Sequence, residues 1–197
     1  MNSPHKERLF ASVDIGIQNF SICIGSFVTG NDLRVILWEN WNLNQHGGEQ
    51  VVFEKLVYQL FSECQLLFKC DVIGIESQAL SGPPIKRMLS TLVGILTTMK
   101  FVHGYDYAIK IIHGKLKYDM LPFPQEYRDL HNNVRLHHYH TRKKMTVQQM
   151  NSYFKTNWKT LERKFKPWEH ILFSNDIKKD DLYDSFLQLC YMVRTYL

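Results

Sequence analysis

Apolar and polar residues alternate over residues 9–43 in the pattern of three consecutive strands. Residues 9–28 contain two apolar runs, LFASVDI and FSICIGSFV, with the turn-forming residues Gly16 and Asn19 between them. The run LRVILWENWNL over residues 33–43 predicts a third strand, and the pair Gly47-Gly48 ends the pattern. Strands joined by such short turns are compatible with antiparallel pairing.

Helical and strand patterns alternate over the next part of the chain. Apolar residues recur at helical spacing over residues 51–68 and again over residues 85–99, which predicts two helices. The run DVIGIE over residues 71–76 is nearly continuous, as expected of a buried parallel strand. The run YAIKII over residues 107–112 alternates and predicts a further strand.

From about residue 113 to residue 140 neither period is present, so we expect an insertion or a long loop. Helices are predicted again over residues 142–158 and 178–196. The order β-β-β-α-β-α-β, an insertion, then α-α predicts an α/β fold with a mixed sheet flanked by helices. We interpret residues 1–197 as one domain with an insertion at about 113–140.

Composition sets the broad class. With 45% hydrophobic and 22% charged residues among 197, the chain can form a sizeable core. The formal net charge of +5 favours an anionic partner, although a solvated basic surface would give the same value. Four cysteines, all in apolar stretches and without a C-x-x-C pair, indicate buried, reduced thiols in an intracellular, reducing compartment. No N-terminal apolar segment and no run of about 18 apolar residues occurs, so we expect no signal peptide and no membrane span.

Four carboxylates stand out by their context. Asp14 lies in an apolar strand, Glu76 ends another, and Asp181 and Asp184 share one face of the last helix. Clustered acids repel one another unless a cation lies between them, and Mg²⁺ prefers carboxylate oxygens. Two such ions can activate water and stabilise the leaving oxygen in phosphodiester hydrolysis. Each acid alone also has a structural explanation, as a turn former, a strand end or a helix-terminal charge.

Three sequence motifs carry a family resemblance. SVDIGIQNFSICI resembles the Asp-x-Gly-x-x-Asn hairpin of RuvC-like Holliday junction resolvases, and IGIESQ resembles their Ile-Glu-x-Gln motif. KKDDLYDSFLQ resembles their Asp-x-x-Asp motif at the start of the C-terminal helix. The branch found in poxviruses, other large DNA viruses and fungal mitochondria fits best, and the ordered motifs cover most of the chain.

This resemblance implies an RNase H-like fold, a homodimer, Mg²⁺ or Mn²⁺, and paired nicks across a four-way DNA junction. Carried over by position, Asp14, Glu76, Asp181 and Asp184 would be catalytic metal ligands. The family also places a catalytic lysine before the last helix, where RKKM offers Lys143 or Lys144, with Lys144 slightly favoured. The location implied is a viral replication site in the host cytoplasm or nucleus, or a mitochondrion.

Several basic residues are candidates for DNA contacts. Lys86 and Arg87 begin a predicted helix, and Arg142 and Lys143 begin another. The run from Lys155 to Lys166 suits backbone contacts or stacking. An amphipathic helix with its aromatic residues in the core explains the same run equally well. His131, His137, His138 and His140 match no standard zinc spacing and are interpreted as part of a polar loop near DNA.

Other functions remain open at this point. Another RNase H-like nuclease, such as an RNase H or an exonuclease, would share the acidic residues and differ in substrate. An actin-like ATPase also opens with an Asp-x-Gly hairpin, but it needs a second Gly-rich phosphate loop that the sequence lacks. A non-catalytic DNA-binding module of the same fold would bind metal and DNA without cleavage.

Overall fold

The computed structural model describes residues 7–28, 33–43, 48–77, 82–120, 139–174 and 179–197. Five strands form one sheet: β1 (Arg8–Asp14), β2 (Phe20–Phe27), β3 (Arg34–Trp41), β4 (Val72–Ser77) and β5 (Ala108–His113). The longer helices are α1 (Glu49–Ser62), α2 (Pro83–His103), α4 (Tyr139–Phe165) and α6 (Asp180–Tyr196). Shorter helical segments are η1 (Gln65–Lys69), η2 (Leu116–Met120), η4 (Lys166–Trp168) and α5 (Glu169–Phe173).

The sheet is mixed, with the strand order β3-β2-β1-β4-β5. β1 pairs antiparallel with β2, and β2 pairs antiparallel with β3. β4 is parallel to both β1 and β5, so its position beside β1 brings the ends of these two strands to the same edge. The predicted element order and the α/β class with a mixed sheet are therefore confirmed.

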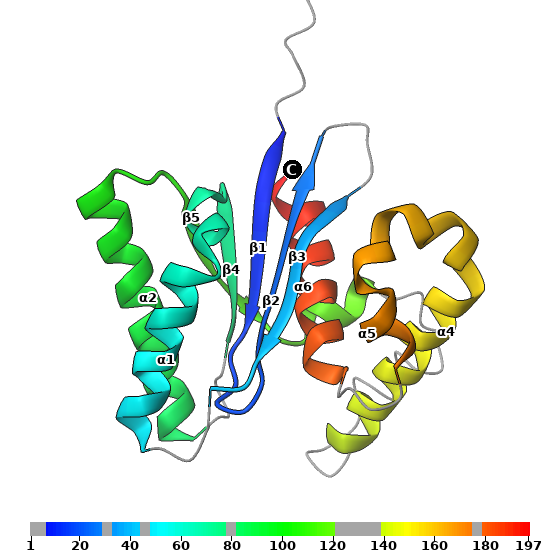
Figure 1. Ribbon diagram of the computed structural model, residues 1–197, viewed down its shortest axis with the longest axis horizontal. Coiled ribbons are helices and arrows are strands. Elements are labelled where there is room, and N and C mark those ends of the chain that lie inside the picture. Colours follow the sequence, from blue (N-terminus) through cyan, green and yellow to red (C-terminus); the bar gives the residue numbers. More distant parts are fainter. Residues whose placement is uncertain (1–6, 29–32, 44–47, 78–81, 121–138, 175–178) are drawn as a thin grey trace, which may run out of the picture.

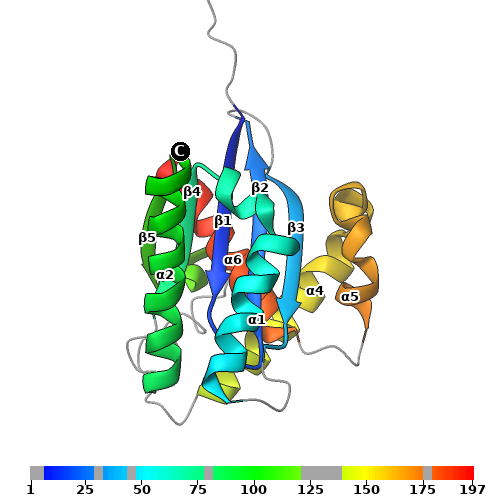
Figure 2. The ribbon, with the colours of Figure 1, turned by 60° about the vertical axis from the view of Figure 1, so that its left-hand side comes forward.

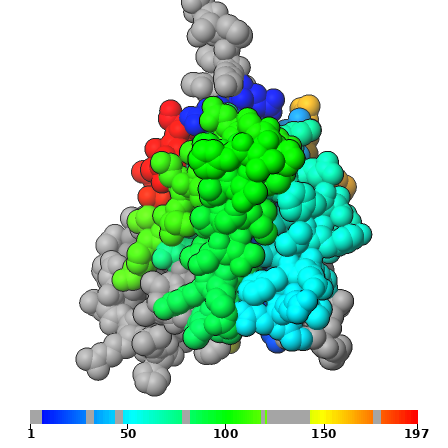
Figure 3. All heavy atoms as spheres, turned by 90° about the vertical axis from the view of Figure 1, so that its left-hand side faces the viewer, coloured from blue at the N-terminus to red at the C-terminus, as the bar shows by residue number. Residues whose placement is uncertain are grey.

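Helices cover both faces of the sheet, and each face has its own core (Figures 1 and 2). α1 and α2 pack on one face over residues such as Ile22, Ile73 and Leu92. α6 lies against the other face, α4 packs on the far side of α6 and against β3, and α5 packs against α4. Figure 3 shows the outer surface of the helices on the first of these faces, where α1 and α2 lie side by side.

α6 is buried along most of its length because it lies between the sheet and α4. Residues 180–189 are all buried, including five polar ones that a surface helix would expose to water: Asp180, Asp181, Asp184, Ser185 and Gln188. Trp38 of β3 is 1% exposed and donates from its indole Nε1 to the carbonyl of Leu182, 2.8 Å away. The aromatic rings of Phe154 and Phe186 lie next to Trp38, so one cluster joins β3, α4 and α6.

Two boundaries differ from the sequence-based predictions. The helix expected over residues 51–68 is divided, because Cys64 leaves helical geometry and the 3-10 helix η1 follows. The helix expected from residue 142 begins at Tyr139 and extends to Phe165. The predicted insertion begins with η2, while residues 121–138, with His131, His137 and His138, lie outside the described residues.

The four cysteines are free, as predicted. Cys23, Cys64 and Cys70 are buried, and burial raises the pKa of the Cys64 thiol to about 12. Cys190 is only partly buried, contrary to the expectation that all four lie in the core. No helix in the described part of the chain combines the length and the hydropathy needed to cross a membrane.

Candidate active site

The predicted acidic residues lie at one edge of the sheet. Asp14 is the last residue of β1, and Glu76 is the fifth residue of the parallel strand β4. Because Val13 lies opposite Ile75 in the register, the following residues Asp14 and Glu76 lie side by side at this edge of the sheet. α6 begins at this edge with Asp180 and Asp181, and Asp184 lies about one turn further.

Polar contacts hold α6 against β1 and β4, which carry two of these acids, and against the neighbouring strand β2. Ser185 shares a hydrogen bond with Ser21 of β2, with 2.9 Å between the hydroxyl oxygens. The amide of Gln188 donates to the carbonyl oxygens of Gly74, at 3.2 Å, and Val13, at 3.4 Å. Both side chains are fully buried, so the position of Asp184 relative to β1 and β4 is defined by packed, hydrogen-bonded neighbours.

Lys117 lies at the centre of this group. Its ammonium nitrogen is 2.7 Å from Glu76 Oε2 and 2.8 Å from Asp184 Oδ2, and the side chain is only 4% exposed. Lys117 belongs to η2, which packs against α6. Sequence reasoning missed this residue because it lies in the segment without periodicity. A lysine a few residues beyond the end of a parallel strand was the available signal.

A second lysine approaches the acids from α4. Lys143 Nζ lies 2.6 Å from Asp181 Oδ1 and 2.9 Å from Asp180 Oδ2. The neighbouring Lys144 is exposed, so Lys143 rather than Lys144 contacts the carboxylates in this arrangement. Two lysines from different elements therefore bring positive charge into one acidic centre.

Electrostatics confirm that the acids influence one another. Burial raises the pKa of Asp14 well above its usual range, and the negative charge of Glu76 raises it further. The ammonium of Lys117 acts in the opposite direction. Burial also raises the pKa of Asp184, while Lys117 lowers it. The centre thus favours either bound protons or nearby cations over bare negative charge.

Gly114 leaves space for one of these carboxylates. It follows β5, and a β-carbon at this position would lie 3.1 Å from Cδ of Glu76 and closer still to its Oε1. A contact of this kind with a nearly buried carboxylate would force the Glu76 side chain to move. The absence of a side chain at residue 114 is therefore part of the geometry of the centre.

The donor set fits a hard divalent cation, because carboxylate oxygens are the ligands that Mg²⁺ and Mn²⁺ prefer. Within the described ranges, however, no three Asp, Glu, His or Cys side chains are grouped as ligands of a single ion. The cations between the carboxylates are instead the ammonium groups of Lys117 and Lys143. Cation binding would therefore require these two lysines or the carboxylates to shift.

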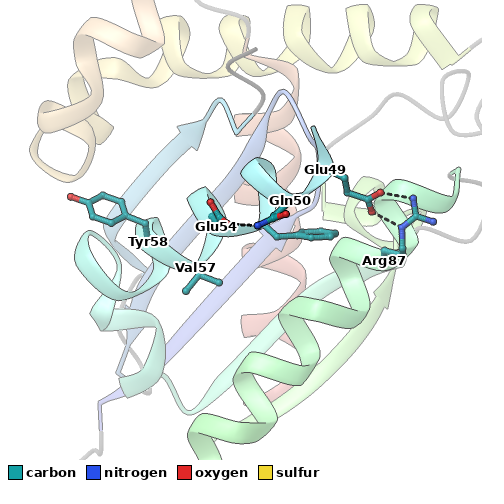
Figure 4. A pocket seen from close by; sticks show the side chains of 7 residues that line it. Glu49, Gln50, Glu54, Val57, Tyr58 and Arg87 are labelled. Atoms are coloured by element: carbon teal, nitrogen blue, oxygen red, sulfur yellow. Dashed lines mark hydrogen bonds and ion pairs between the residues drawn. The ribbon is translucent and has the colours of Figure 1, made fainter. Parts of the chain in front are cut away.

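The predicted DNA-contacting residues are placed differently. Lys86 is exposed in the first turn of α2, at the edge of the sheet where β4 ends. Arg87 pairs with Glu49 of α1, where the guanidinium Nη2 lies 2.7 Å from Glu49 Oε2 (Figure 4). This pair reduces the charge that Arg87 offers to a phosphate. Arg142 lies in the first turn of α4, and the contacts of its side chain lie outside what the structure describes.

Comparisons with known proteins show that the fold is similar to that of solved Holliday junction resolvases. Neither known protein families nor curated proteins match the sequence. Among solved structures, the yeast mitochondrial Holliday junction resolvase Ydc2 is similar at 20% identity and a TM-score of 0.57, covering 94% of this chain and 77% of that chain. The resolvase of fowlpox virus, solved with Holliday junction DNA, has 18% identity and a TM-score of 0.55, covering 94% and 99%.

Bacterial RuvC has the same fold. The RuvC of T. thermophilus, in complex with a Holliday junction substrate, has 9% identity and a TM-score of 0.55, covering 94% of this chain and 95% of that one. The chain therefore has the RNase H-like fold of the Holliday junction resolvases over nearly its whole length, as the motif resemblance implied.

Proposed function

We propose that this chain is a structure-specific endonuclease that resolves four-way DNA junctions by metal-dependent phosphodiester hydrolysis. The observation that carries the proposal is the grouping of Asp14, Glu76 and Asp184 around buried Lys117. This grouping lies at one edge of a sheet whose fold is that of solved Holliday junction resolvases. Fold and acidic centre therefore support the same function.

Asp14, Glu76, Asp181 and Asp184 are the proposed ligands of Mg²⁺, with Mn²⁺ as an alternative. Such an ion, when bound, would lower the pKa of a water molecule and stabilise the leaving oxygen. The residues of the chain orient this centre, because Ser185 and Gln188 hold α6 against β1 and β2. The pKa of Asp14 is raised by burial, so this carboxyl holds its proton more tightly than an exposed aspartate, and a bound cation would favour its ionised form.

The proposed role of Lys117 is to stabilise negative charge on the scissile phosphate. Its ammonium is held within the centre by two carboxylates, so once a cation binds these carboxylates the displaced ammonium would remain close to an incoming phosphate. Lys143, which contacts Asp181, is the better placed of the two lysines first considered for this role. Replacing Lys117 with Gln should lower the rate of cleavage about 100-fold. Lys115→Gln, two residues away and exposed, is the matched control and should cleave normally.

The active protein is proposed to be a homodimer. Paired nicks on two strands require two acidic centres, and a two-fold dimer would match the approximate symmetry of a four-way junction. The outer face of α1 and α2 exposes apolar residues suited to such contact. Among them, Val57 and Tyr58 line an open depression that also includes Phe53 (Figure 4). The similar resolvases from yeast mitochondria and a poxvirus support action inside cells, at a mitochondrial or a viral replication site.

A substrate comparison tests this function. The protein is incubated with Mg²⁺ and a labelled four-way junction, a linear duplex of the same sequence, or an RNA–DNA hybrid. We expect cleavage of the junction alone, and none after the metal is removed with EDTA. Cleavage of the hybrid or of the duplex ends would indicate an RNase H or an exonuclease. Junction binding without cleavage in either Mg²⁺ or Mn²⁺ would indicate a non-catalytic binding module.

A further inference from the structure

α4 has two distinct faces. One face is apolar and packs into the core shared with α6 and β3, through residues that include Met150, Phe154 and Phe165. The opposite face is exposed and mostly polar. At 100° per residue, a stripe about 100° wide along this face contains six exposed residues. They are Lys144, Gln148, Ser152, Lys155, Lys159 and Arg163.

The charge of this stripe is almost all of one sign. α4 contains seven basic residues and one acidic residue, Glu162. Glu162 already pairs with Lys166, with 2.9 Å between the ammonium nitrogen and the carboxylate oxygen. Among the described residues, Lys155, Lys159 and Arg163 form no ion pair. Four positive charges, including Lys144, thus remain available to an anionic partner along one line.

The stripe begins at the candidate active site and leads away from it. Lys143 contacts Asp181, and the next residue, Lys144, is the first basic member of the stripe. In Figure 1, the beginning of α4 lies near the start of α6, and the helix then extends outward from the sheet. Lys144 to Arg163 spans about 28 Å at the rise of an α-helix. This is on the order of 8 base pairs of duplex DNA at 3.4 Å each.

The stripe contains no aromatic residue for base stacking, since the partly exposed Tyr153 of the same helix lies outside it. Phe154 and Phe165 are buried, and the ring of Trp158 packs edge-on against Phe173 with 4.8 Å between centroids. The stripe therefore offers ammonium, guanidinium, amide and hydroxyl donors without an apolar centre. A protein interface would need apolar anchors, whereas phosphate contacts need only charge and hydrogen-bond donors.

We propose that this stripe of α4 binds the phosphate backbone of one duplex arm of the DNA substrate and guides that arm away from the active site. The inference rests on the proposed function for the identity of the substrate. It assigns the contact to the sugar-phosphate backbone, so the stripe contributes affinity and orientation without a preference for base sequence.

The test compares two triple variants that remove equal charge. The stripe variant is Lys155→Gln, Lys159→Gln and Arg163→Gln. The control is Arg34→Gln, Lys69→Gln and Arg194→Gln, all exposed and all at the end of the sheet far from Asp14. Binding to a four-way junction and to a linear duplex is measured without divalent cation over a series of salt concentrations. Circular dichroism melting checks that both variants are folded.

The stripe variant should bind both DNAs on the order of tenfold more weakly than the control. The slope of its plot of log affinity against log salt concentration should be smaller in magnitude by about 2 to 3, because each lost phosphate contact reduces that slope by about 0.9. At saturating protein it should still nick the junction at the wild-type rate. Equal weakening and equal slopes in the two variants would overturn the proposal, since net charge alone would then explain the loss.

The outcomes also separate this inference from the proposed function. If the wild-type protein nicks junctions but the stripe and control variants behave alike, the proposed role of the stripe is wrong and the nuclease assignment stands. If the wild type never nicks junctions but its duplex binding depends on the stripe, the nuclease assignment is wrong and the binding surface stands.

Discussion

At the scale of single residues, the centre is defined by charges that are buried together. Asp14, Asp184 and Lys117 are all nearly inaccessible to solvent. Burying charge is costly unless an opposite charge lies close by, and each carboxylate raises the pKa of its neighbours. Such a group weakens the fold slightly, which is expected where residues are arranged for chemistry rather than for stability.

Asp14→Asn should stabilise the metal-free protein. Folding raises the pKa of Asp14 above its ordinary value of 3.8. The contribution of this carboxyl to the stability of the fold is therefore fully present below that pH, and it is lost as the pH rises through the raised pKa of the folded state. The free energy of unfolding of the variant should be about 1 kcal/mol higher, which corresponds to about 2–4 °C in Tm. This gain should be larger at about pH 8 than at about pH 5. Calorimetry in EDTA measures this. Asp106→Asn, at an exposed aspartate, should show no such gain, and an equal gain there would contradict the account.

Gly114→Ala should impair the centre without unfolding the protein. The added methyl group would displace the Glu76 carboxylate, because a β-carbon at residue 114 would lie too close to it. We expect cleavage to fall at least about tenfold, since small displacements of catalytic groups are costly. Stability should change by less than about 1 kcal/mol. Gly94→Ala in α2, where a β-carbon meets nothing within 4 Å, is the control. Full activity of Gly114→Ala would show that the space beside Glu76 is unimportant.

At the scale of elements, the sequence predicted what depends on local periodicity and missed what depends on tertiary contact. β1, β4 and α6 carry clear apolar patterns, so Asp14, Glu76 and Asp184 could be placed at their ends in advance. Lys117 could not, because η2 is a five-residue 3-10 helix whose position depends on packing against α6. The choice between Lys143 and Lys144 likewise depends on which side of α4 faces α6, and residues 139–142 carry little apolar signal to indicate it.

The junction of β3, α4 and α6 depends on Trp38. Its indole N–H donates to Leu182 just after the Asp180-Asp181 pair, so the ring fixes the start of α6 as well as filling the core. Trp38→Phe keeps an aromatic ring, but it removes the hydrogen-bond donor to the Leu182 carbonyl and opens a small cavity. Stability should fall by about 2 kcal/mol in urea unfolding. Trp158→Phe, at a partly buried ring, should cost less, and the reverse order would contradict this role.

At the scale of the whole molecule, the fold is that of the resolvases, and the coordinated cutting proposed above would need a second copy. If α1 and α2 form the dimer surface, Val57→Glu with Tyr58→Glu should give a monomer in sedimentation at working concentrations. Junction nicks on the two strands should then become uncoupled. Ile36→Glu, at an exposed apolar residue of β3, should leave the assembly unchanged. A wild-type protein that remains monomeric with and without junction DNA would contradict the dimer altogether.

The most direct test of the acidic centre follows both labelled strands of one four-way junction in Mg²⁺, with wild type, Asp14→Asn and Asp106→Asn in parallel. The account predicts symmetrically placed nicks on two opposing strands by the wild type and by Asp106→Asn. It predicts that Asp14→Asn still binds the junction and cuts at least about 100-fold more slowly. Undiminished cutting by Asp14→Asn would contradict the assignment of the active site to the ends of β1, β4 and the start of α6.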